Sequence, residues 1–179
     1  MRSIVIAAAV LTGCATTPVQ SAQDELYASV SSHCGHSLHG RVVTNDPQDA
    51  ALIGKPIVGR FAACTASEVR INVAVGDDTS RNWVISRTPG GLRLKHLHLH
   101  TDGTEDQISG YGGDTIAPGT AERQEFPLDA FSRDLFTRLN RPGSLTNVWA
   151  VEARPGEFYA YELRNATGRF FRLELHRRG

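Results

Sequence analysis

Hydrophobic and polar residues alternate in short runs over most of the chain after residue 40, a pattern typical of β-strands. In Val69–Val75 the hydrophobic side chains occupy every second position, as expected for a strand with one buried face. Because Gly, Pro and Asp separate these runs at short intervals, the pattern predicts an antiparallel barrel or sandwich. The predicted strands are Arg41–Thr44, Ile57–Ala63, Glu68–Val75, Asn82–Arg87, Leu92–His100, Asp106–Tyr111, Asn147–Ala153, Glu157–Arg164 and Arg169–His176.

Two segments depart from this alternation and predict helices. Ser21 suits a helix N-cap, and acidic residues follow it in the first turn. This helix should end near Ser31–Ser32 or at Gly35. Within Pro127–Leu139, hydrophobic residues recur at helical spacing after a proline suited to a first turn, and Asn140 should end that helix.

Tight turns join the last three predicted strands, which therefore form a meander with one hydrophobic face. A meander of this kind that closes on itself is how lipocalin-like barrels are built. We expect a mostly β domain, either an antiparallel lipocalin-like barrel or a sandwich, with an N-terminal helix and one inserted helix. This likeness concerns the fold and implies no activity.

Three of the seven histidines lie in the predicted strand Leu92–His100, just before Asp102-Gly103, a pair typical of hairpin turns. One face of the resulting hairpin would be polar near the turn and hydrophobic farther from it. With Asp102 and Gly103 as the turn, the predicted register pairs His100 with Glu105, His98 with Gln107, His96 with Ser109 and Leu94 with Tyr111.

Two interpretations of this histidine face remain open. The imidazoles either lie on a solvated sheet surface or point into a barrel, above a hydrophobic floor. Polar groups that converge over a hydrophobic pocket are typical of a small-molecule site. The candidate ligand-binding residues are Leu92, Leu94, His96, His98, His100 and Tyr111.

A metal site is a variant of the second interpretation. Neighbours on one strand face lie about 7 Å apart, so two adjacent imidazoles could chelate one ion. All three could not share an ion without a bulge. The candidate metal ligands are His96, His98 and His100, with Glu105 as a further oxygen ligand, and the sequence identifies no other cofactor.

The N-terminus begins with a basic and then hydrophobic leader. Arg2 precedes the hydrophobic run Ile4–Leu11, which is shorter than the roughly 20 residues that span a membrane. The tetrad Leu11-Thr12-Gly13-Cys14 resembles the lipobox of bacterial lipoproteins. The resemblance implies cleavage before Cys14 and lipidation of its thiol, with residues 1–13 as signal peptide, 14–20 as lipidated tether and 21–179 as a single β-rich domain.

The lipobox implies a membrane-anchored protein of the bacterial cell envelope that faces the periplasm. Ala15 follows the lipidated position, which by analogy with lipoprotein sorting in enteric bacteria favours the outer membrane. In that oxidising compartment Cys34 and Cys64 are expected to form a disulfide. The alternative is a metal or redox site built from His33, Cys34, His36 and His39.

The composition limits the function further. Its 19 basic residues balance 19 acidic ones, so no attraction to nucleic acid is predicted. The chain contains no Gly-x-Ser-x-Gly motif and no serine that stands out as a nucleophile, which argues against an enzyme. Segments 87–115 and 145–175 are similar to small exported proteobacterial proteins of no assigned activity. Binding of a small or hydrophobic ligand is the favoured function, and assembly with another envelope protein is the alternative.

Overall fold

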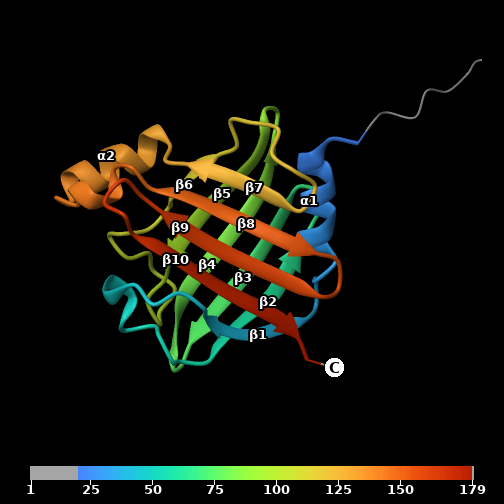
Figure 1. Cartoon of the computed structure of the whole chain (residues 1–179), viewed down its shortest axis with the longest axis horizontal. Coiled ribbons are helices and arrows are strands. Elements are labelled where there is room, and N and C mark those ends of the chain that lie inside the picture. Colours follow the sequence, from blue (N-terminus) through green and yellow to red (C-terminus); the bar gives the residue numbers. More distant parts are fainter. Residues whose placement is uncertain (1–19, 179) are drawn as a thin grey trace, which may run out of the picture.

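The computed structural model describes residues 20–178, in which one antiparallel sheet of ten strands curves into a nearly closed barrel (Figure 1). The lipobox lies outside the described residues. Strands β1 to β6 form one meander, β7 to β10 form a second, and β10 pairs with β1. The strands are β1 (Ser37–Val42), β2 (Ile57–Cys64), β3 (Glu68–Val75), β4 (Asp78–Thr88), β5 (Gly91–His98), β6 (Tyr111–Asp114), β7 (Arg123–Pro127), β8 (Val148–Arg154), β9 (Phe158–Arg164) and β10 (Phe170–Arg177).

The predicted barrel with an N-terminal and an inserted helix is confirmed. Helix α1 spans Ala22–Ser31 and α2 spans Ala130–Arg138, and two short 3-10 helices are η1 (Pro47–Asp49) and η2 (Pro142–Ser144). Within residues 20–178 neither helix is long and apolar enough to cross a membrane.

Helix α2 begins later than the sequence predicts. Pro127, expected in the first turn of the helix, is instead the last residue of β7. The sequence predicts no strand at this position. Asp129 is the N-cap, and its side chain accepts a hydrogen bond from the backbone N–H of Ser132 at 2.8 Å. The helix therefore begins at Ala130, directly after the capping residue Asp129, and not at Pro127.

Strands β6 and β7 meet at the seam that closes the barrel. Gly113 and Leu128 form an isolated bridge, and Ser132 Oγ both accepts from the Gly112 N–H (2.7 Å) and donates to the Gly112 carbonyl (3.0 Å). A Cβ atom at Gly113 would overlap the carbonyl oxygen of Pro127. The two edges therefore approach this closely because residue 113 has no side chain.

Gly113→Ala should consequently push the seam apart and lower the free energy of unfolding by about 1–3 kcal/mol, the usual cost of overpacking. Gly90→Ala is a matched control, because nothing lies within 4 Å of the added Cβ there. Urea denaturation of both variants measures the effect, and equal midpoints would contradict this account of the seam.

Helix α1 closes one end of the barrel (Figure 1). Its buried face is formed by Leu26, Tyr27 and Val30, and the predicted N-cap Ser21 forms a capping box with Asp24. The predicted disulfide is also present: Cys34, just beyond α1, is bonded to Cys64 at the end of β2. Because the sulfur of Cys34 is bonded, it is not free to act as a ligand in the alternative metal site.

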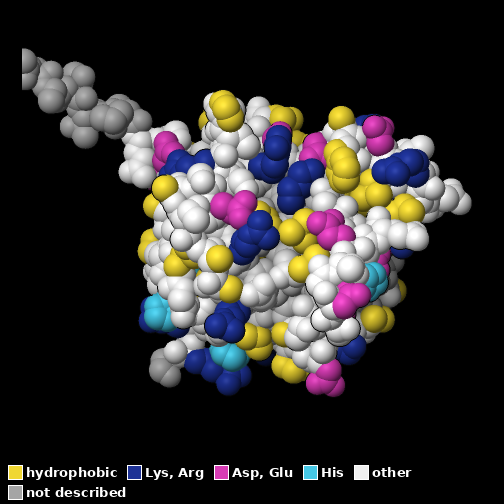
Figure 2. All heavy atoms as spheres, turned by 180° about the vertical axis from the view of Figure 1, so that it is seen from behind, with side chains coloured by type: hydrophobic (Ala, Val, Ile, Leu, Met, Phe, Trp, Pro, Cys, Tyr) yellow, Lys and Arg dark blue, Asp and Glu magenta, His cyan; other side chains and the backbone are white. Residues whose placement is uncertain are grey.

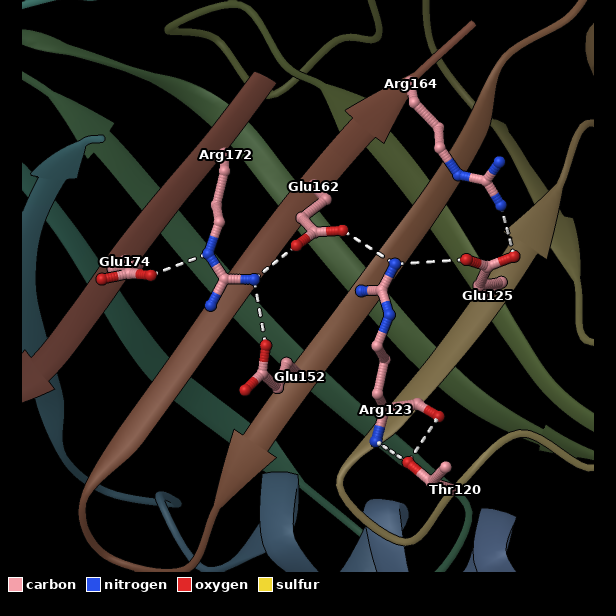
Figure 3. Close-up of polar contacts among 8 residues, drawn as sticks. All are labelled: Thr120, Arg123, Glu125, Glu152, Glu162, Arg164, Arg172 and Glu174. Carbon is pink, nitrogen blue, oxygen red and sulfur yellow. Dashed lines mark hydrogen bonds and ion pairs between the residues drawn. The ribbon is translucent and has the colours of Figure 1, made fainter. Parts of the chain in front are cut away.

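Ion pairs cover the outside of the barrel. On the face formed by β3 to β6, basic side chains lie beside acidic ones (Figure 2). On the opposite face, arginines and glutamates link β7, β8, β9 and β10 in one network (Figure 3). Its centre is Arg172, which contacts Glu152 (2.9 Å), Glu174 (2.7 Å) and Glu162, while Arg123 bridges Glu162 (2.8 Å) to Glu125 (3.1 Å).

Candidate ligand-binding site

A cavity of about 360 Å³ opens in the barrel interior at the end opposite α1. Helix α1 contacts β5, β7 and β8, with Gln23 beside Gly91 at the start of β5, whereas the cavity is bordered by His96 and His98 at the end of β5 and by Trp149 near the start of β8. Phe136 of α2, Arg141 after it and Ser144 of η2 border the cavity, and α2 lies on the side of the barrel away from α1 (Figure 1). Eight ring-bearing side chains form much of the wall: Trp83, His96, His98, Tyr111, Phe136, Trp149, Tyr161 and Phe171.

His96 occupies the centre of this wall and is 2% exposed. Its Nε2 lies 2.8 Å from the hydroxyl of Tyr161, and its Nδ1 lies 3.2 Å from the backbone carbonyl of Tyr111. Because a carbonyl only accepts, Nδ1 carries the proton, and Nε2 accepts from the Tyr161 hydroxyl. Burial lowers the pKa of His96 to about 3 and raises the pKa of Tyr161 well above its usual value, so both groups are neutral.

The rings pack against one another and so hold the wall in place. Trp83 stacks on Tyr161 with ring centroids 4.3 Å apart, and His96 stacks on Tyr111 at 4.6 Å. The hydroxyl of Tyr111 lies 3.1 Å from Nε2 of His98. These contacts pair the hydroxyls of Tyr161 and Tyr111 with the two histidines before any ligand arrives, so this part of the wall presents flat ring faces to the cavity.

The histidine face points into the barrel at two of its three positions. His96 and His98 line the cavity, which excludes the solvated-surface interpretation for them, while the side chain of His100 is 55% exposed outside it. Leu92 and Leu94 are fully buried in the core on the side of α1 and do not border the cavity. Tyr111, which the sequence groups with the histidines as a candidate ligand-binding residue, lines the same cavity.

The predicted hairpin register is wrong. His96, rather than Leu94, faces Tyr111, and Leu94 faces Gly113. The segment expected to be a strand at 106–110 instead forms a loop, in which Asp106 Oδ1 accepts from the Ile108 N–H at 2.8 Å. This local side-chain contact ends the pairing that starts at the Asp102-Gly103 turn and moves the start of β6 to residue 111.

The candidate metal ligands are not brought together. Nε2 of His96 and of His98 face tyrosine hydroxyls, and His100 lies outside the cavity, where its Nε2 is 4.0 Å from Asp106. Glu105 is exposed beside Leu99. Between residues 20 and 178, no three His, Cys, Asp or Glu side chains form a group that could hold a metal ion.

Three arginines line the cavity, and none of them is among the ligand-binding residues predicted from the sequence. Arg81 lies at the start of β4 and pairs with Asp78, and Arg169 lies between β9 and β10 and pairs with the buried Asp49. The third, Arg141, follows α2. Within the described part of the chain, no aspartate or glutamate lines the cavity.

The position of Arg141 is fixed by the way α2 ends. Asn140 has a positive φ of 50°, and the Arg141 N–H donates to the Phe136 carbonyl at 2.8 Å while the Asn140 N–H donates to Thr137 at 3.1 Å. This pattern is a Schellman motif, in which the chain leaves the helix in a defined direction. The predicted helix stop at Asn140 is thus confirmed, although its link to the cavity follows only from the fold.

The burial of His96 predicts a pH-dependent stability. In the unfolded chain histidine has a pKa near 6.5, whereas in the folded protein the pKa of His96 is about 3. The unfolded state therefore takes up the proton first, and stability is lost as the pH falls from about 6.5 toward 3. Between pH 7.5 and 5, His96 should account for about 2 kcal/mol of lost unfolding free energy.

His96→Gln removes the titrating group and keeps hydrogen-bonding atoms at the site. Urea denaturation at pH 7.5 and pH 5 measures the unfolding free energy that each protein loses between the two pH values. This loss should be about 2 kcal/mol smaller in the variant than in the wild type. An equal loss in both proteins would contradict the assignment of His96 as a neutral buried group.

The site has the chemistry of a receptor for small molecules: a rigid aromatic wall, neutral hydrogen-bonding groups and a basic rim. No protein-family model, curated protein or solved structure matches this chain. The function must therefore be inferred from the geometry of the cavity.

Proposed function

We propose that this protein is a lipid-anchored component of the bacterial cell envelope that binds a small, largely hydrophobic ligand in its barrel without catalysis. The cavity of about 360 Å³ at the open end of the barrel carries this proposal. Its volume lies at the lower end of the 300–1,000 Å³ range of small-molecule pockets, so the ligand is small.

The wall favours binding of a flat apolar molecule. Trp83 and Trp149 expose ring surface to the cavity although both are at least 95% buried from solvent. An aromatic ligand placed against them gains stacking contacts beyond the burial of its surface. Because His96, Tyr161 and Tyr111 are held by one another, such a ligand needs no rearrangement of the wall.

The lipobox supports the location. Acylation of Cys14 would hold the domain at a membrane, with the outer membrane favoured by Ala15. The Cys34–Cys64 disulfide fits an oxidising compartment such as the periplasm. Mass spectrometry of the native protein tests this directly: we expect an N-terminus at Cys14 with a diacylglycerol on its sulfur. An uncut chain with a free thiol would refute the location but leave the cavity unchanged.

Ligand binding can be followed through the two tryptophans of the chain, since both line the cavity. We expect 2-naphthalenemethanol to change their fluorescence and to raise the melting temperature. At a free ligand concentration of 100 times Kd, binding should add about 2.7 kcal/mol to the free energy of unfolding. Ser144→Trp should obstruct the mouth and abolish both effects, whereas Ser144→Ala should keep them, because Ser144 lies in η2 at the rim. No response in the wild type would favour the alternative, a role in assembly with another envelope protein.

A further inference from the structure

We infer that the ligand is a small aromatic carboxylate, with its ring against the tryptophan and tyrosine wall and its acid group held at the mouth by Arg141, Arg81 and Arg169. This inference rests on the proposed function and adds the charge of the ligand to it. The observation behind it is the uneven charge of the cavity lining, which among residues 20–178 includes three arginines and no aspartate or glutamate.

The field of the three arginines extends into the cavity. The pKa of the buried Tyr111 hydroxyl is raised to about 12 by desolvation, and the positive charges of Arg81, Arg169 and Arg141 each oppose that rise. Tyr111, which lines the cavity, therefore lies within the electrostatic reach of all three arginines. An anion in that space would be attracted by the same charges, in surroundings where water screens them less than at an open surface.

Arg141 is the arginine best placed to bind an anion. Asp78 and Asp49 already compensate Arg81 and Arg169, but between residues 20 and 178 Arg141 forms no ion pair. Its backbone is fixed on one side by the Schellman motif and on the other by Pro142. A guanidinium group can hold a carboxylate with two parallel, charge-assisted hydrogen bonds, whereas the single hydroxyl of an alcohol cannot form this pair.

A second polar group lies close to this rim. Asn147 is 5% exposed and borders the cavity, and its Oδ1 accepts from Asn165 at 3.2 Å. Its Nδ2 donates no hydrogen bond within residues 20–178, so that N–H group remains available to an acceptor. Donors at the mouth and apolar rings inside match a molecule with an acid group at one end, whose charge would keep partial contact with water.

The test compares two probes that share one ring system, 2-naphthoate and 2-naphthalenemethanol, by tryptophan fluorescence of the full chain. We expect the carboxylate to bind at least about 10-fold more tightly than the alcohol, as a charge-assisted hydrogen bond predicts. Arg141→Gln should reduce the affinity for the carboxylate about 10-fold and leave the affinity for the alcohol unchanged. Arg138→Gln is the matched control, since it removes the same charge from the exposed last turn of α2.

The outcomes separate the two proposals. Equal affinity for both probes would overturn the carboxylate assignment and leave the proposed ligand binding intact. A preference for the carboxylate that Arg141→Gln and Arg138→Gln reduce equally would also overturn it, because it would reflect net charge alone. Binding of neither probe would overturn the proposed function itself.

Discussion

Replacing both Cys34 and Cys64 with alanine should lower the free energy of unfolding by about 3–4 kcal/mol. The disulfide closes a loop with a sequence separation of 30 residues, and removal of this link gives the unfolded chain more conformations. It also joins the segment after α1 to the end of β2, so its loss frees the helix that closes the barrel. Chemical denaturation of the variant and the wild type measures the difference.

Wild-type protein in excess dithiothreitol is the matched control for the double variant. Its denaturation curve should coincide with that of the variant, because both lack the link and Cys64 lies at an exposed position where alanine leaves little empty space. A loss below 1 kcal/mol would mean that the barrel confines the α1 segment without the covalent bond.

Arg172→Ala should be the most damaging single change on the outside of the barrel, with a loss of about 2–3 kcal/mol at neutral pH. The arginine side chain is 18% exposed and lies among Glu152, Glu162 and Glu174. Its removal leaves three carboxylates close together, and their repulsion adds to the loss of the hydrogen bonds. Partial exposure to water keeps the expected effect below that of a fully buried pair.

Arg164→Ala provides the comparison for Arg172. Arg164 lies at the edge of the same network, is 50% exposed and contacts one carboxylate, Glu125, at 2.5 Å. Its replacement should cost less than about 1 kcal/mol. Added salt should reduce the difference between the two variants, since it screens the repulsion among the uncovered glutamates. If both variants lost a similar amount of unfolding free energy, the ion pairs would act independently of one another and not as one network.

Local chemistry explains what the sequence predicts well. The N-terminal helix follows from a Ser21–Asp24 capping box, and the end of α2 follows from Asn140, whose side chain tolerates a positive φ. The last meander follows from the alternation of hydrophobic residues in β9 and β10. Each of these features depends on residues within a few positions of one another.

The parts that the sequence does not predict depend on contacts between distant residues. Strand β7 is short and ends in a proline, and it pairs with β8 only because the barrel brings them together. Arg81 lies in β4, Arg141 follows α2 and Arg169 lies between β9 and β10, and the three come together only at the cavity. No periodicity or motif links them along the chain, whereas the inward-facing His96 and His98 lie in one strand and could be selected together.

Helix α1 has a consequence for how the protein would meet its ligand. The described chain begins beside this helix, at one end of the barrel (Figure 1), whereas the residues that border the cavity lie toward the other end. If Cys14 is acylated as proposed, the end of the barrel that α1 covers would face the bilayer, and the end with the cavity would face the aqueous periplasm. Such an orientation suits capture of a dissolved metabolite, or transfer from a water-borne carrier, and would prevent direct extraction of lipid from the membrane.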